Sequence, residues 1–197
     1  MPGDARYRIL LGLVIAGLVV VRSYHHAQSL RAGPVQRFES PLNMTLRAIA
    51  GFAGLALLIV YLAKPEWLAW AAIPLRPWLR WAGFVLGIAS LALLAWVHHE
   101  LGRNFSGTLH LRAEHTLVTS GPYRWARHPM YTAFYGLGLA FLLVPANWLL
   151  GGIVLLSVTA VMISRVNKED ALMAERFGQQ YRAWAAHTGR FLPRLRT

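Results

Sequence analysis

The stretch PMYTAFYGLGLAFLLVPANWLLGGIVLLSVTAVMIS, residues 129–164, contains no charged side chain and no histidine. It is too long for a single crossing of a hydrocarbon core, which takes about 20 residues in a helix. Pro145-Ala146-Asn147 interrupts the stretch near its middle. Proline and asparagine favour turns, and the residue before a proline is kept out of the helical region. The stretch therefore predicts two membrane-spanning helices joined by a tight hairpin.

The rest of the chain has the composition of a membrane protein. Only 14% of the 197 residues are charged and 56% are hydrophobic, whereas a soluble domain carries about 25% charged residues. The mean hydropathy is +0.40. Three further charge-free runs precede the hairpin, at residues 9–21, 48–63 and 81–97. We therefore predict one all-α integral membrane domain over residues 1–197, with about five transmembrane helices and a helical C-terminal tail.

The first three spans are expected at about residues 7–21, 45–62 and 79–98. The basic segment 22–43 is expected to be a loop. The segment 65–77 is rich in tryptophan and proline, and tryptophan favours the headgroup level of a bilayer. We therefore expect a short helix or loop on the outer surface there. Arg6 and Arg8 before an apolar run also fit a cleaved signal peptide, but no small-x-small cleavage site follows, which favours a retained helix.

Lysine and arginine are divided unevenly between the two sides of a five-span arrangement. Of the 20 such residues, five fall on the side of the N-terminus and the other fifteen on the opposite side. The positive-inside rule then predicts an N-terminus outside, with the C-terminus and any functional site in the cytoplasm. The net charge of +12 does not indicate a nucleic-acid partner, because a nucleic-acid-binding domain would not be this apolar.

Two polar clusters flank the hairpin, GPYRWARHPMYT at residues 121–132 and Arg165 to Asp170. Both fall on the predicted cytoplasmic side. Polar groups at the ends of membrane helices are costly to place and indicate a functional site, although a basic flank that sets topology is an alternative. Arg165 and Glu169 are four residues apart, which fits a helix-surface ion pair or a charged pair set against a bound ligand.

His98-His99-Glu100 at the end of the third span raises the possibility of a metal site. Adjacent helical residues point about 100° apart, and a helical metal motif needs histidines at i and i+4. We therefore predict no metal and interpret the three residues as polar capping at the membrane interface. The chain has no cysteine, which excludes disulfides and thiolate nucleophiles.

Together, the two clusters resemble the isoprenylcysteine carboxyl methyltransferase family, part of a wider group of integral-membrane methyltransferases that includes phospholipid methyltransferases. The resemblance covers about half of the chain, from residue 101 to the C-terminus. It rests on LVTSGPYR at 117–124, RHPMYT at 127–132, Arg165, Glu169-Asp170, Leu172, Phe177-Gly178, Tyr181 and TGRFLP at 188–193. The charge-free runs place three N-terminal spans within residues 1–100, and the resemblance implies that residues 101–197 form the cofactor-binding and catalytic half.

The resemblance also implies S-adenosylmethionine as methyl donor, bound at the cytoplasmic ends of the last helices under the C-terminal tail. The residues it implies for cofactor binding are Tyr123, Arg127, His128, Pro129, Tyr131, Glu169 and Asp170. It implies Arg165 and Glu169 as catalytic residues, and Arg165, Tyr135 and Arg190 as substrate-binding residues. The family often shows two glutamates at the position of Glu169-Asp170, so the shorter Asp170 is a departure from it.

The function that follows is S-adenosylmethionine-dependent methyl transfer to a lipophilic small-molecule or prenylated acceptor from the bilayer, with O-methylation of an isoprenylcysteine-like carboxylate as the first expectation. N-methylation of a phospholipid amine is the main alternative, and it needs a base such as His128 or Glu169. An NADPH-dependent sterol-type reductase is a more distant alternative. A membrane scaffold without enzymatic activity would leave the clustered Arg, His, Tyr and Glu unexplained.

Overall fold

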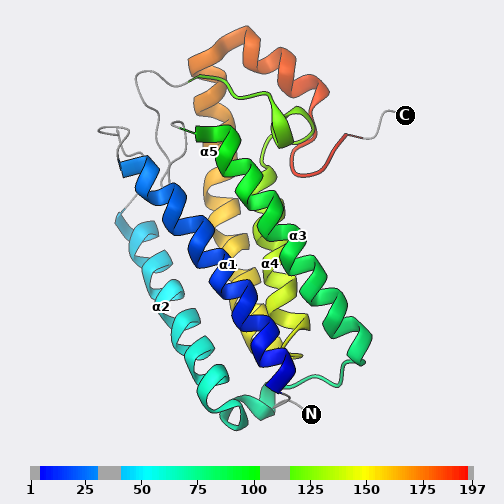
Figure 1. The fold of residues 1–197 in the computed structure, drawn as a ribbon. Coiled ribbons are helices and arrows are strands. Elements are labelled where there is room, and N and C mark those ends of the chain that lie inside the picture. Colours follow the sequence, from blue (N-terminus) through cyan, green and yellow to red (C-terminus); the bar gives the residue numbers. More distant parts are fainter. Residues whose placement is uncertain (1–4, 31–40, 103–115, 195–197) are drawn as a thin grey trace.

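A computed structural model describes residues 5–30, 41–102 and 116–194, and helices account for most of them (Figure 1). The long helices are α1 (Ala5–Leu30), α2 (Pro41–Ala63), α3 (Pro77–Leu101), α4 (Pro129–Leu143) and α5 (Trp148–His187). Two short 3-10 helices are η1 (Pro65–Ala71) and η3 (Gly121–Arg124). The two β-bridges in the described part of the chain are isolated residue pairs. The predicted all-α membrane fold is confirmed.

Five helices lie where five spans are expected, but they differ in length. By length and apolar character, α1, α3 and α5 can each cross a membrane. The described part of α2 and η1 qualify only together, and they are bent by 113° at their junction. The 15 residues of α4 are fewer than the roughly 20 that a straight crossing takes. The described residues therefore provide three spans, or up to four if the bent pair forms one.

The expected loop at 22–43 is wrong at both ends, because α1 continues to Leu30 and α2 begins at Pro41. Arg22 ends the apolar run, but the residues that follow it are compatible with a helix and none is proline or glycine before Gly33. A charged residue marks the edge of the hydrophobic segment without ending the helix. The polar end of α1 consequently lies beside the end of α3 (Figure 1).

The hairpin between α4 and α5 is confirmed at Pro145 to Asn147. The side chain of Asn147 is buried, accepts a hydrogen bond from the backbone N of Leu150 at 3.2 Å and donates to the carbonyl of Leu68 at 3.0 Å. It thus caps α5 and attaches the turn to η1. Arg80 of α3 donates from Nε to the carbonyl of Val144 at 2.9 Å. This carbonyl lies at the C-terminal end of α4, and a helix C-terminus is stabilised by a nearby positive charge.

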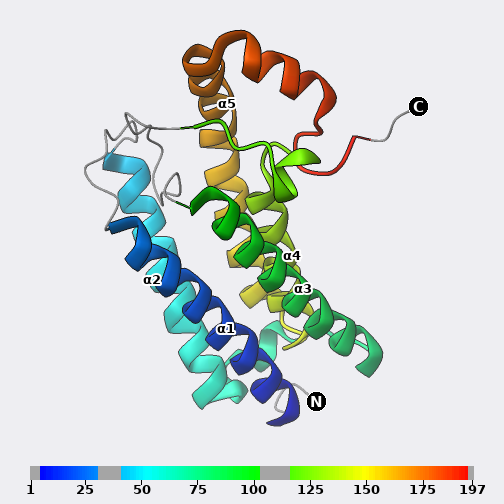
Figure 2. The ribbon, with the colours of Figure 1, turned by 45° about the horizontal axis from the view of Figure 1, so that its top comes forward.

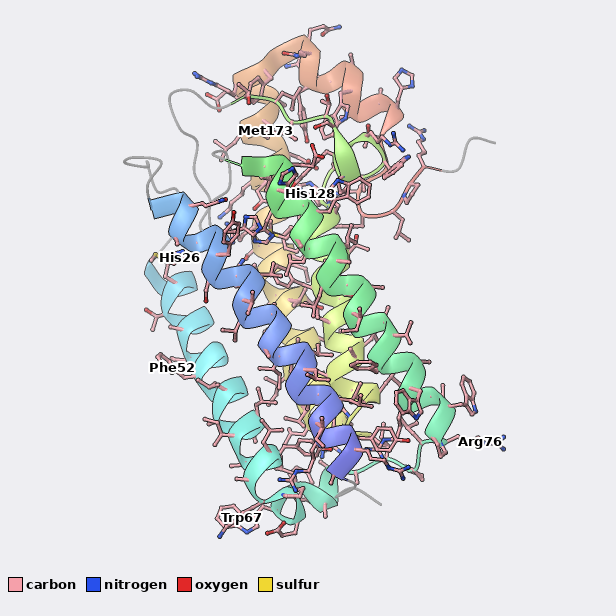
Figure 3. The ribbon with its side chains drawn as sticks, viewed as in Figure 1. His26, Phe52, Trp67, Arg76, His128 and Met173 are labelled. Carbon is pink, nitrogen blue, oxygen red and sulfur yellow. The ribbon has the colours of Figure 1, made fainter. Side chains whose placement is uncertain are left out.

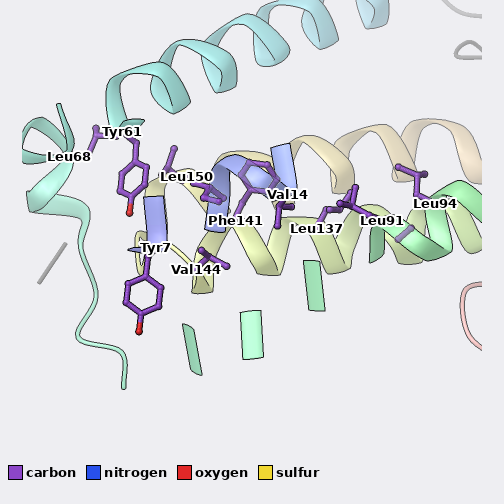
Figure 4. Close-up of a cluster of buried hydrophobic side chains, with 12 residues drawn as sticks. Tyr7, Val14, Tyr61, Leu68, Leu91, Leu94, Leu137, Phe141, Val144 and Leu150 are labelled. Carbon is purple, nitrogen blue, oxygen red and sulfur yellow. The ribbon is translucent and has the colours of Figure 1, made fainter. Parts of the chain in front are cut away.

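Small residues bring α4 close to its neighbours. A Cβ at Gly138 would lie 2.6 Å from the Leu155 side chain, and one at Gly151 would lie 2.2 Å from Cβ of Leu142. The apolar core, part of which is shown in Figure 4, continues from Tyr7 and Leu150 to Leu94. Because α4 is held tightly between α3 and α5, the position of its N-terminus, where the polar cluster begins, is fixed.

The outer surface of the bundle is apolar. Phe52 on α2 points away from the other helices (Figure 3), and Leu156 and Ile163 on α5 are 72% and 71% exposed. Trp67 of η1 is exposed at the end of the bundle that holds the α4–α5 turn (Figure 3). An apolar surface of this extent requires a nonpolar surrounding, so the chain is an integral membrane protein.

The interpretation of His98 as an interface cap is wrong. The side chain of His98 is fully buried, and its Nδ1 lies 2.7 Å from the carbonyl of Leu94 in the same helix. Its ring lies 4.9 Å from that of His25 on α1. His98 continues the buried face of α3 one turn beyond Leu94, whereas His99 is exposed, so the two neighbouring histidines point apart as expected.

Candidate active site

The loop that leads into α4 is held by the end of α3. Glu100 accepts hydrogen bonds from Ser120 Oγ at 2.5 Å and from Trp96 Nε1 at 3.2 Å. Gly121 follows with φ of 55°, and a Cβ on it would lie 2.4 Å from Cγ of Glu100. A glycine suits this position because the backbone is left-handed and the approach is close. This contact orients η3 and the residues that follow it.

His128 occupies the position before α4, with Pro129 in the first turn of the helix. Pro129 is suited to this place, since the missing N–H would have no partner there. The imidazole is directed to α5, where Nε2 lies 2.9 Å from Oδ1 of Asp170 and Nδ1 lies 3.4 Å from Oε2 of Glu169. Figure 3 labels His128 near the end of the bundle that the C-terminal segment crosses. Both ring nitrogens are therefore occupied by carboxylates.

Glu169 links α4 to α5. Its Oε1 lies 3.5 Å from Nε of Arg165, so the two residues form the i,i+4 ion pair that is one of the two interpretations of their spacing. The same oxygen accepts a hydrogen bond from Tyr131 Oη at 3.4 Å. The Arg165 side chain is only 12% exposed, so this guanidinium is held inside the site.

Asp170 contacts four polar side chains, and the sequence pattern does not predict these contacts. Beside His128, it accepts a hydrogen bond from Tyr181 Oη at 2.5 Å and another from Arg190 Nη2 at 3.2 Å. Nη1 of Arg127 lies 3.5 Å from its second oxygen. The shorter acid is thus the most connected side chain that the structure describes in this cluster.

The charges of the cluster do not balance. Burial alone would lower the pKa of His128, but hydrogen bonds from its ring to Asp170 and Glu169, together with their negative charges, raise it. Burial, and then the charge of Glu169, raise the pKa of Tyr123. Three guanidinium groups, on Arg127, Arg165 and Arg190, face the two carboxylates, and the excess positive charge suits an anionic ligand group.

The C-terminal tail folds back over the cluster, as predicted. α5 changes direction near Gly178, which has non-helical angles of φ 52° and ψ −124°. The residues beyond it run across the end of the bundle (Figure 2). We call residues 179–187 the arm and residues 188–191 the strap. The backbone N of His128 donates to the carbonyl of Arg190 at 2.9 Å, and Thr132 donates to the carbonyl of Phe191 at 2.6 Å.

The structure brings most of the predicted residues together, but Tyr135 lies apart. Its hydroxyl lies 2.7 Å from Oγ1 of Thr159 on α5, below the ionic cluster. Tyr181 and Phe191, which belong to the family resemblance but have no role assigned there, also lie at the site: the Phe191 ring lies 6.0 Å from that of His128 and 6.4 Å from that of Tyr131. The break at Gly178 prevents their positions from being predicted by helical spacing.

Three buried donors in the cluster and the arm have no hydrogen-bond partner among the described residues. They are Nε of Arg127, Nε of Arg165 and Nε1 of Trp184. Buried donors are nearly always bonded in folded proteins, so these three indicate a ligand with several acceptor atoms. Carboxylate groups and ring nitrogens would supply acceptor atoms of this kind.

The chain is similar to known proteins over the region that contains this site. Residues 82–175 match the family model for the isoprenylcysteine carboxyl methyltransferase (ICMT) family. The protein-S-isoprenylcysteine O-methyltransferase of Rattus norvegicus is 28% identical over 114 residues, and that of Homo sapiens 26%. Each alignment covers 57% of this chain and 40% of the relative, so the chain matches less than half the length of these relatives.

A solved structure supports the fold over nearly the whole chain. The structure of the eukaryotic intramembrane Ras methyltransferase ICMT has a TM-score of 0.62 and 21% sequence identity. The match covers 98% of this chain and 69% of the solved one. It therefore extends the similarity to the N-terminal helices, in which the sequence alone contains no recognisable family motif.

Proposed function

Through residues 82–175, this chain belongs to the isoprenylcysteine carboxyl methyltransferase family, and on that premise we propose that it transfers a methyl group from S-adenosylmethionine to the carboxylate of an isoprenylcysteine-like acceptor. We choose a carboxylate as the acceptor because both ring nitrogens of His128 already face the side chains of Glu169 and Asp170, so His128 is not available as a base. A carboxylate acceptor is nucleophilic at neutral pH and needs no base.

Arg127 and Trp184 are the residues we assign to the methyl donor, since their buried donors have no partner in the described part of the chain. When bound, S-adenosylmethionine supplies an electrophilic sulfonium methyl group. The aromatic faces of Tyr131 and Phe191 lie beside His128 and suit a sulfonium cation. Glu169 adds a negative charge that balances it.

Arg165 is the residue we assign to the acceptor. Its guanidinium is largely buried, and the 3.5 Å ion pair of its Nε with Glu169 holds it in one orientation although the same Nε makes no hydrogen bond within the described chain. A guanidinium binds a carboxylate through two parallel hydrogen bonds. Holding the acceptor in line with the donor is then the main task of the site, and such alignment lowers a barrier by several kcal/mol, up to about 10.

An amine acceptor is less well served by this arrangement. It has to lose a proton before methylation, and the base must lie within hydrogen-bond reach of it. His128 is bonded on both sides, and Glu169 already contacts Arg165, Tyr131 and His128. Both predicted bases therefore already have partners among the described residues. We accordingly rank N-methylation of a phospholipid second.

The lipophilic part of the acceptor would lie in the bilayer. Leu156 and Ile163 are seven residues apart on α5 and both are largely exposed, so they form an apolar strip that faces away from the bundle. An acceptor whose tail lies in the bilayer would present its polar head at the level of Arg165, where the apolar part of α5 ends. We place this end of the bundle in the cytoplasm, on the basis of the Lys and Arg distribution.

Methylation assays on the purified full-length protein test the proposal. Radiolabelled S-adenosylmethionine is offered with a farnesyl-cysteine analogue, with phosphatidylethanolamine, or with no acceptor. We expect label in the farnesyl-cysteine ester only. Label in the amine lipid alone would replace the acceptor assignment, and binding of NADPH in place of S-adenosylmethionine would point to a reductase.

A further inference from the structure

The arm does not continue the axis of α5, so the direction of α5 does not determine the direction of the arm. Gly178 interrupts the helix with a left-handed backbone, which glycine adopts without the steric cost other residues meet. A Cβ at this position would meet nothing within 4 Å, so packing around Gly178 does not fix the bend either. Both ribbon views show the arm turning across the end of the bundle (Figures 1 and 2). Contacts further along the arm must therefore hold it.

Asp170 provides the contact in the middle of the arm. Tyr181 is buried, and its hydroxyl donates to Oδ1 of Asp170. The same oxygen faces Nε2 of His128, and the other oxygen accepts from Arg190 in the strap. One carboxylate consequently joins α5, the loop before α4, the arm and the strap.

Two of the three unbonded donors depend on this carboxylate. Arg127 lies 3.5 Å from Asp170 through Nη1, while its Nε has no hydrogen-bond partner among the described residues. The Trp184 ring lies 5.5 Å from that of Tyr181 in the same arm, so a shift of Tyr181 would change what the indole packs against. The third donor, on Arg165, is held by Glu169 instead. The two adjacent acids thus organise different donors.

We propose that Asp170 is a positioning residue for the methyl donor, acting through Arg127 directly and through Tyr181 and the arm on Trp184, whereas Glu169 orients Arg165 for the acceptor. This inference rests on the proposed function and deepens it by dividing the site into two halves. Loss of the bond between Tyr181 and Asp170 lowers the affinity for S-adenosylmethionine and leaves the acceptor half intact.

The variants Tyr181→Phe and Asp170→Asn keep the side-chain shapes and test this division. A hydrogen bond to a charged group contributes enough that its loss should weaken S-adenosylmethionine binding about tenfold or more in calorimetry. The KM for the donor should rise in parallel, while kcat at saturating donor and the KM for the acceptor stay within about threefold of wild type. Tyr24→Phe and Glu175→Gln, both exposed, are the matched controls and should behave as wild type.

The double variant sharpens the test, because both changes act on one hydrogen bond. It should bind S-adenosylmethionine no more weakly than Asp170→Asn alone, since losses through a shared contact are not additive. Trypsin should also cut faster after the exposed Arg182 in the Tyr181→Phe variant without ligand, a readout independent of activity. The thermal unfolding temperature of each variant identifies any that fails to fold.

Wild-type affinity in either single variant, or additive losses in the double variant, would overturn the positioning role. If the wild-type protein itself binds no S-adenosylmethionine, the proposed function fails as well. If the wild type binds and Tyr181→Phe binds equally, only the positioning role fails. The two proposals therefore fail through different results.

Discussion

Nε2 of His128 and Oδ1 of Asp170 lie 2.9 Å apart although 42 positions separate the two residues in the chain. With Glu169 at the other ring nitrogen, the imidazole forms a bridge between the start of α4 and the polar end of α5. A positively charged ring can donate to both carboxylates, whereas a neutral ring can donate to only one. The protonated state of His128 is thus the one that holds the two helices together.

The stability of the protein should fall with rising pH through this contact. The pKa of His128 in the folded state is raised above its ordinary value of 6.5. Below the unfolded-state pKa, the stabilisation is fully present, and it is lost as the pH rises through the higher folded-state pKa. Thermal unfolding in detergent from pH 6 to pH 9 should show this loss.

The His128→Gln variant serves as the control for the pH effect. It retains hydrogen-bonding groups but carries no titrating proton, so its unfolding temperature should vary less over the same pH range. Equal pH dependence in the two proteins would show that other groups cause the change.

Arg165→Lys should not restore the function that Arg165→Ala removes. Removing one member of a buried charge pair costs about 2–5 kcal/mol, which predicts a loss of kcat/KM of at least about 30-fold. Lysine keeps the charge but lacks the planar fork that binds a carboxylate. Steady-state kinetics against a farnesyl-cysteine analogue measure this, with Lys168→Ala, an exposed cation on the same helix, as control. A lysine variant with wild-type kcat/KM would argue against carboxylate binding by Arg165.

Two adjacent glycines on α5 should respond oppositely to alanine. A Cβ at Gly151 would lie 2.6 Å from Cα of Leu142, so Gly151→Ala should destabilise the α4–α5 hairpin by about 1–3 kcal/mol. A Cβ at Gly152 would meet nothing within 4 Å, so Gly152→Ala should be neutral or stabilise the helix by up to about 1 kcal/mol. Thermal unfolding of the two variants provides the comparison, and equal shifts would contradict the predicted packing.

The two ends of the chain should lie on opposite sides of the membrane. α1 begins at one end of the bundle and the arm lies at the other (Figure 1), which agrees with an odd number of crossings. The distribution of Lys and Arg predicts the arm in the cytoplasm. Fusions to a reporter that is active only in the cytoplasm should be active at the C-terminus and inactive at the N-terminus. The reverse pattern would place the site on the outer side.

The helical fold and the location of the site could be predicted from local features. The charge-free stretch at 129–164 is long enough for two helices, and Pro145 and Asn147 determine where the turn occurs. The polar residues at both of its ends fall on one side because a hairpin brings its two outer ends together. The ion pair of Arg165 with Glu169 follows from helical spacing alone.

The role of Asp170 and the burial of His98 were decided only by the tertiary structure. Asp170 has its partners on the loop, the arm and the strap, and no spacing in the sequence relates these segments, since Gly178 breaks the helical register between Asp170 and Tyr181. His98 is buried because α1 continues past its apolar run and brings His25 beside it. The formation of an apolar helix depends on residues within one segment, so it can be predicted from the sequence. Contacts between polar side chains far apart in the chain depend on how the segments pack, so they cannot.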